Sequence, residues 1–146
     1  MRKGESEGNP YTFLSKADFL QSVANGEFLE YAEVNGGNLY GTPLSWVDAT
    51  LTRGHDAILK IDVQGGKSVV ERLPDTLRIF LAPPSLVELE RRLRARGTET
   101  DAAIMVRLAD AKNEMEASKH YDYIVINDDA KAAAVQLMNI MLAERK

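Results

Sequence analysis

Apolar and polar positions follow one pattern in the first part of the chain and another in the rest. Early on, short apolar runs are separated by turns rich in glycine and asparagine, and "NGGN" at residues 35–38 predicts a hairpin because glycine tolerates positive φ. Farther along, dense apolar runs alternate with segments whose apolar residues recur at helical spacing. Buried parallel strands alternating with helices have this second pattern. The sequence therefore predicts an α/β fold with a parallel sheet and an added lobe.

The same pattern gives the expected bounds of the elements. The first ten residues are polar and rich in turn formers, which predicts a loop. Strands are predicted over residues 11–15, 25–34, 38–42, 55–63, 77–82 and 121–127. Helices are predicted over residues 15–24, 43–53, 66–72, 85–96, 101–117 and 128–145. Ser15 and Ser85 each precede an acid by three residues, which is the capping-box signature of a helix start.

Length and composition restrict the class of protein. The 146 residues suffice for one domain with a hydrophobic core, and 45% apolar residues favour a globular fold over disorder. The net charge of -4 disfavours a non-specific nucleic-acid binder. The sequence contains no cysteine, no apolar run of transmembrane length and no signal peptide, so we expect a cytoplasmic protein without membrane partners.

Two possible sites are rejected on spacing. His55 and His120 have no ligand partner at helical spacing, so no metal site built from protein side chains is expected. The segment "QGGKS", residues 64–68, matches the last residues of the phosphate-binding loop motif. That motif also needs a glycine five residues before the glycine of Gly-Lys-Ser, and Ile61 occupies that position.

Polar residues at predicted strand ends and in the hairpin are the candidates for chemistry. Ligands of parallel sheets bind at the carboxyl ends of strands, here at Asp62, at residues 82–85 and at Asn127. The hairpin places an acid, Glu30, near a phenol and a hydroxyl in residues 40–42. These residues either are ordinary polar residues of a surface hairpin or line a pocket that recognises one ligand.

Six motifs in a fixed order point to one protein family. They are "RKGESEGNPYTF", "GEFLEYAEVNGGNLYGTP", "ILKIDVQG", "FLAPPSLVELERRLRARGTET", "VRLADAKNEM" and "YDYIVINDD". In these motifs, from Arg2 to the last helix, the sequence resembles guanylate kinase, which phosphorylates GMP with ATP. The resemblance implies a nucleoside monophosphate kinase-like parallel sheet with helices on both faces, truncated at the N-terminus. It also implies a GMP-binding lobe at about 1–42, a core at 43–96 and 118–146, and a helical lid at about 97–117.

The resemblance assigns a GMP site to the first part of the chain. Guanine presents an N1–H and an N2 amino group side by side, and one carboxylate accepts both hydrogen bonds, whereas adenine offers neither. Glu30 matches the carboxylate that reads guanine, unless it is a solvated strand acid. The other residues implied at the GMP site are Thr42 for the base, Tyr11, Tyr40 and Arg2 for the phosphate, and Asp62 near the metal-bound phosphates.

The resemblance also assigns residues to the ATP side. Arg92, Arg96 and Arg107 match lid arginines that neutralise charge on the transferring phosphoryl group, although a solvated basic helix face has the same composition. Asn127 matches a residue near the adenine of ATP, and a helix cap is its alternative role. Mg²⁺ bound with ATP is the implied cofactor.

Two departures from the family pattern qualify the expected activity. Lys60 stands where many relatives carry an acid, which puts a guanine contact from that position in doubt. The family's phosphate loop has no counterpart in the 146 residues, so we expect weak or no kinase turnover from this chain alone. The alternatives are a catalytically inactive module that binds phosphorylated partners, or a fragment that associates with itself through an exposed sheet.

Overall fold

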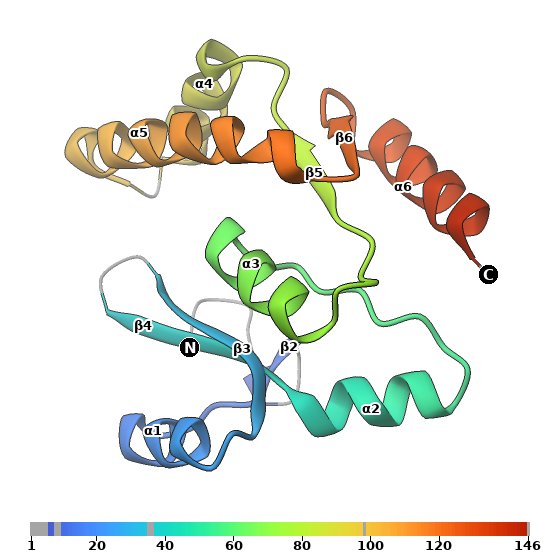
Figure 1. Ribbon diagram of the computed structural model, residues 1–146. Coiled ribbons are helices and arrows are strands. Elements are labelled where there is room, and N and C mark those ends of the chain that lie inside the picture. The colour runs from blue at the N-terminus through green and yellow to red at the C-terminus, as the bar shows by residue number, and fades with distance from the viewer. Residues whose placement is uncertain (1–5, 8–9, 35–36, 98, 146) are drawn as a thin grey trace. The chain divides into compact units, whose positions relative to one another are not determined.

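The fold is seen in a computed structural model that describes residues 6–7, 10–34, 37–97 and 99–145 (Figure 1). The chain divides into two compact units, residues 1–74 and residues 75–146. Each unit holds its own strands and helices.

The first unit is built on an antiparallel hairpin. Its elements in chain order are β1 (Ser6–Glu7), β2 (Pro10–Tyr11), α1 (Lys16–Ala24), β3 (Phe28–Val34), β4 (Asn38–Pro43), α2 (Leu44–Thr52) and α3 (Val63–Arg72). Strands β3 and β4 pair antiparallel, and α3 lies alongside β3 (Figure 1). Leu29 of β3, Val47 of α2 and Val69 of α3 form one buried cluster. The hairpin is therefore held by two helices that follow it in the sequence.

The second unit is built on a parallel strand pair. Its elements are β5 (Ile79–Ala82), α4 (Leu86–Arg96), α5 (Asp101–Ala117), the 3₁₀ turn η1 (Ser118–His120), β6 (Tyr123–Ile126) and α6 (Ala130–Glu144). Helix α4 packs against α5, and α6 packs against β6. Strands β5 and β6 are parallel with Ala82 opposite Ile126, so the segments after both strands begin at the same edge. This pair confirms the predicted α/β class with parallel strands.

Local sequence signals set most helix ends. The Ser15 and Ser85 hydroxyls accept hydrogen bonds from the backbone of Asp18 and Glu88, as the capping boxes predicted. Gly97 ends α4 in the left-handed conformation at φ +63°, where glycine has no Cβ to clash. Within the described residues, the six α-helices lie where the periodicity placed them, within a few residues.

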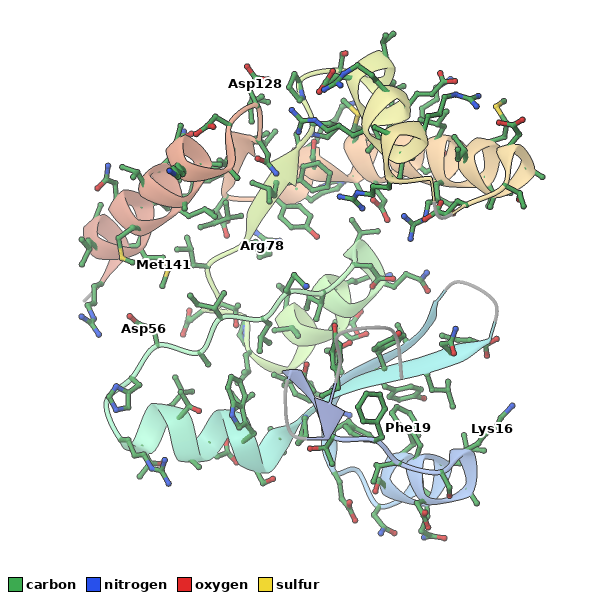
Figure 2. The ribbon with its side chains drawn as sticks, turned by 180° about the vertical axis from the view of Figure 1, so that it is seen from behind. Lys16, Phe19, Asp56, Arg78, Asp128 and Met141 are labelled. Atoms are coloured by element: carbon green, nitrogen blue, oxygen red, sulfur yellow. The ribbon has the colours of Figure 1, made fainter. Side chains whose placement is uncertain are left out.

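Contacts between side chains distant in sequence fix the elements within each unit. Phe19 of α1 points toward the hairpin (Figure 2), and its ring stacks on that of Phe28 at 4.6 Å between centroids. Arg78, just before β5 in Figure 2, donates from its backbone N to Asp122 at 2.8 Å and from its guanidinium to the same carboxylate at 2.9 Å. Arg78 and Asp122 therefore join the starts of the two parallel strands.

Three predictions about elements are wrong. Residues 55–62 are irregular, although a buried strand was expected there. Leu59 and Ile61 pack against the Leu29 cluster while Ile58 is 69% exposed, so the side chains alternate. A strand also needs a ladder partner for its N–H and C=O groups, and no described strand pairs with this segment.

The other two errors concern the start of the chain. The strand expected over residues 11–15 reaches only Tyr11, and the predicted N-terminal loop contains β1, which pairs in parallel with β2. Residues 1–5 and 8–9 lie outside the described part of the chain.

Candidate functional site

The hairpin places Glu30 and Thr42 opposite each other. These two residues are register partners on β3 and β4. The Thr42 hydroxyl donates to Oε1 of Glu30 at 2.7 Å. The predicted turn lies partly outside the described residues, and within it Gly37 has φ +89°. The register of the hairpin therefore brings the hydroxyl to the carboxylate.

Glu30 is an unusual strand acid because it is buried, with 5% of its surface exposed. Burial raises the pKa of the Glu30 carboxyl above its ordinary value of 4.5, and the negative charge of Asp62 raises it further. The hydrogen bond from Thr42 opposes both effects because it favours the charged form. A solvated surface acid would be neither buried nor tied to a neighbour in this way.

The N-terminus of α3 forms the other side of this acid. Asp62 caps the helix and accepts from the backbone N of Gly65 at 2.8 Å. Asp62 is therefore a helix cap rather than the last residue of a strand, and α3 begins three residues earlier than expected. Arg72, at the end of the same helix, donates to the carbonyl oxygen of Phe28 at 2.7 Å. Sequence reasoning missed this anchor because nothing local connects residues that far apart.

Two tyrosines expected near a phosphate are also neighbours. The rings of Tyr11 and Tyr40 meet edge to face with 5.7 Å between centroids. Tyr40 lies two residues before Thr42 on β4, so both side chains point to the same face of the hairpin. Lys60 is exposed, and Arg2 lies outside the described residues. In the first unit, Glu30 and Asp62 therefore lie at the start of α3, and the two tyrosines lie on the hairpin face that carries Thr42.

A separate cavity of about 240 Å³ lies in the second unit. Its polar lining is formed by Arg92, Arg96, Arg107 and Asn127. Its apolar lining comes from Leu81, Ala82, Pro83, Leu89 and Leu93. The structure therefore brings all three predicted lid arginines and the predicted adenine-side asparagine to one cavity, from α4, α5 and the end of β6.

Arg92 is held by its own chain. Its Nε donates to Glu88 at 2.6 Å, its NH1 to the carbonyl oxygen of Asn127 at 2.6 Å, and its NH2 to that of Asp128 at 2.9 Å. Figure 2 shows Asp128 in the segment between β6 and α6. The Arg91 and Arg92 guanidiniums beside Glu88 lower the pKa of that carboxyl to about 2. Arg92 thus ties α4 to the β6–α6 segment, which the sequence did not suggest.

We expect Arg92→Lys to destabilise the second unit by about 1–3 kcal/mol, because an ammonium has no planar fork to reach both carbonyl oxygens. Thermal unfolding followed by circular dichroism measures the loss. Arg91→Lys is the matched control, since Arg91 is 68% exposed and bonds the same Glu88. Equal losses in the two variants would contradict the anchoring role.

Arg107 and Asn127 also have partners within the second unit. Arg107 pairs with Oε1 of Glu99 at 2.9 Å, and Oε2 of Glu99 is buried without a hydrogen bond in the described chain. The N–H of Asn127 donates to the Ala82 carbonyl at 2.7 Å. The cap of α6 is Asp129, so the alternative role of Asn127 as a cap is wrong.

Several other kinds of site find no support in the described residues. Residues 64–68, which resemble the end of a phosphate loop, lie inside helix α3. No three His, Cys, Asp or Glu side chains within the described ranges gather as a metal site. None of the described helices has the length and apolar character needed to cross a bilayer.

Comparisons with known proteins agree with this geometry. The family model described as guanylate kinase matches residues 1–144. The guanylate kinase of Chromobacterium violaceum is 47% identical over 144 residues, covering 99% of this chain and 68% of that protein. That of Vibrio cholerae is 46% identical over 145 residues, covering 99% and 70%.

A solved structure extends the likeness to the fold. The crystal structure of guanylate kinase from Anaplasma phagocytophilum matches with a TM-score of 0.83 and 36% identity, covering 99% of this chain and 70% of that one. Family model, sequence identity and fold therefore point the same way, and the chain belongs to the guanylate kinase family.

Proposed function

We propose that the first unit binds GMP and reads guanine through Glu30. The observation that carries this proposal is the buried carboxylate held by the Thr42 hydroxyl at 2.7 Å. An ionised carboxylate has about four acceptor positions, so the bond from Thr42 leaves capacity for the N1–H and N2 amino group of guanine. Adenine would leave a buried acid unpaired, which disfavours AMP.

The neighbours of Glu30 supply the remaining contacts of this proposal. Tyr11 and Tyr40 meet ring to ring, and we assign their hydroxyls to the GMP phosphate. Asp62 lies close enough to raise the pKa of Glu30, and we place it near the phosphates. We also assign Arg2 to the GMP phosphate, and this assignment rests on the sequence alone.

The proposed reaction is transfer of a phosphoryl group from ATP to GMP, giving ADP and GDP. In the second unit, Arg96 and Arg107 line the cavity and would neutralise the charge that develops on the phosphoryl group. Arg107 would exchange Glu99 for a phosphate oxygen. Arg92 would act with them while holding the segment that carries Asn127, which we place beside adenine.

Mg²⁺ bound with ATP is the proposed cofactor. Mg²⁺ is usually held by one or two carboxylates together with substrate phosphates, so the lack of a three-acid cluster among the described residues is compatible with it. Asp62 is the carboxylate that fits this role, and its Oδ1 accepts a hydrogen bond from the backbone N of Gly65. The ion would neutralise phosphate charge during transfer.

Three further predictions concern the chain as a whole. Weak turnover by the 146 residues alone is supported by residues 64–68 being helical, since this chemistry needs a loop that cradles phosphates. Leu81, Ile124 and Ile126 are about half exposed in the β5–β6 pair, which supports self-association through that sheet. A cytoplasmic location without nucleic-acid or membrane partners also stays a prediction.

Calorimetric titration of the chain with GMP and then with AMP tests the proposed function. We expect GMP to bind and AMP to bind much more weakly. A phosphorylated peptide is the third titrant, because it would be preferred if the chain were an inactive binding module. Preference for that peptide, or no binding of either nucleotide, would refute the proposal.

GMP affinity is expected to fall as the pH is lowered through the raised pKa of Glu30, because protonation replaces one acceptor by a donor. Titrations from neutral pH down to 4.5 measure this loss. The GMP phosphate also titrates, with a pKa of about 6, so each titration is repeated with Glu30→Gln. The difference between the two proteins isolates the carboxyl, and parallel pH profiles would argue against its role.

The contribution of Glu30 to the stability of the chain should fall as the pH rises, whereas GMP affinity should rise. The folded chain binds a proton at Glu30 more tightly than the unfolded chain. Its contribution to the free energy of unfolding is therefore fully present below 4.5 and is lost as pH rises through the raised pKa.

A further inference from the structure

Gly65 occupies the place where the Glu30 carboxylate and α3 come closest. A Cβ at this position would lie 2.7 Å from Oε2 and 3.3 Å from Cδ of Glu30, and 3.2 Å from Cβ of Ile61. A carbon and a carboxylate oxygen do not approach to 2.7 Å without something moving. The carboxylate of Glu30 thus fills the space that any side chain at residue 65 would need.

The backbone of α3 does not explain a glycine here. Gly65 is a buried residue inside the first turn of the helix, and it is not among the described glycines with positive φ. Glycine is one of the least favourable residues for a helix interior, and alanine is the most favourable. The structural requirement for glycine at this position is therefore space for Glu30, with a smaller contact to Ile61.

The position of the carboxylate is set from two sides. The Thr42 hydroxyl holds Oε1 at 2.7 Å from the hairpin, and Gly65 leaves room for Oε2 against α3. An alanine methyl group would displace Oε2 of Glu30 from α3, either by turning the carboxylate about its bond to Thr42 or by breaking that bond. Either movement would change where the two acceptor oxygens lie.

We propose that Gly65 is a specificity-determining residue of the guanine site: the missing side chain at this position seats the Glu30 carboxylate where it can accept both hydrogens of the guanine edge. This inference rests on the proposed GMP function. Gly65 is a positioning residue, since it acts on the base through Glu30 and not by contact of its own.

Gly65→Ala is the test, with Gly66→Ala as the matched control. Gly66 adjoins Gly65 in α3, so it undergoes the same exchange with its Cβ rotated by about 100° around the helix axis. We expect Gly65→Ala to weaken GMP binding by about 10-fold or more, the effect of one good hydrogen bond to a charged group, and to reduce the preference over AMP. Gly66→Ala should leave both unchanged.

A thermal-unfolding cycle with Glu30→Ala separates positioning from general packing. Removing the carboxylate removes the 2.7 Å clash and leaves only the 3.2 Å contact with Ile61, so Gly65→Ala should lower the melting temperature clearly less in the Glu30→Ala background. Equal destabilisation in both backgrounds would make Gly65 a packing residue for Ile61 and overturn the proposal. That cycle needs no nucleotide, so it gives an answer even for a variant that has lost GMP binding.

The binding data distinguish the two levels of the hypothesis. If the wild-type chain binds GMP and Gly65→Ala binds it equally well, the role of Gly65 fails while the proposed function stands. If the wild-type chain binds neither nucleotide, the proposed function fails, and the role of Gly65 falls with it.

Discussion

Glu30→Gln is expected to weaken GMP binding roughly 100-fold and to strengthen the weak binding of AMP, because the variant no longer leaves a buried acid unpaired against adenine. Glutamine has almost the same shape, and its carbonyl oxygen could still accept from Thr42 at the position of Oε1. Its NH₂ group would then lie opposite the N1–H and N2 amino group of guanine. These groups are all donors, so no hydrogen bond forms between them. The variant exchanges one acceptor for a donor in a buried position, where water does not replace the lost hydrogen bond.

Isothermal titration calorimetry with GMP and AMP measures this change in selectivity. Glu33→Gln is the matched control, because Glu33 is an exposed acid on the same strand. It undergoes the same chemical exchange without altering a buried site. GMP binding that survives in Glu30→Gln, or that falls equally in both variants, would show that Glu30 does not read the base.

Leu29→Ala is expected to lower the free energy of unfolding of the first unit by about 2–5 kcal/mol. Leu29 is 2% exposed and packs with Val47 and Val69, so it joins the strand that carries Glu30 to α2 and α3. Truncation removes apolar contacts from three elements at once and leaves a cavity. A typical domain has about 5–15 kcal/mol of stability, so this loss is a large part of the total.

Denaturant unfolding followed by the fluorescence of Trp46 measures this effect in the right unit. Trp46 is the only tryptophan of the chain and adjoins Val47 in α2. Leu51→Ala, in the same helix, is the control because Leu51 is 52% exposed and its truncation should change stability by about 0.5 kcal/mol or less. A similar midpoint for Leu29→Ala and the wild-type chain would contradict the assigned core.

The helices and the hairpin could be predicted because their causes are local. Ser15 and Ser85 cap their helices from within the same turn, and Gly97 ends α4 by its own backbone freedom. The "NGGN" turn and the alternation on both sides placed β3 and β4. Residues 55–62 could not be predicted in the same way, because a strand exists only when another segment supplies the partner for its ladder.

By itself the sequence determined the α/β class, most element bounds, the family, and which residues are candidates for the two sites. Only the tertiary structure decided that Glu30 is buried against Thr42, that Gly65 leaves space for its carboxylate, and that Arg92 ties α4 to the β6–α6 segment. The physical reason is the range of the interactions involved. Caps, turns and periodicity act between residues a few positions apart, whereas burial, a pKa shift and a steric limit depend on what the fold brings from elsewhere in the chain.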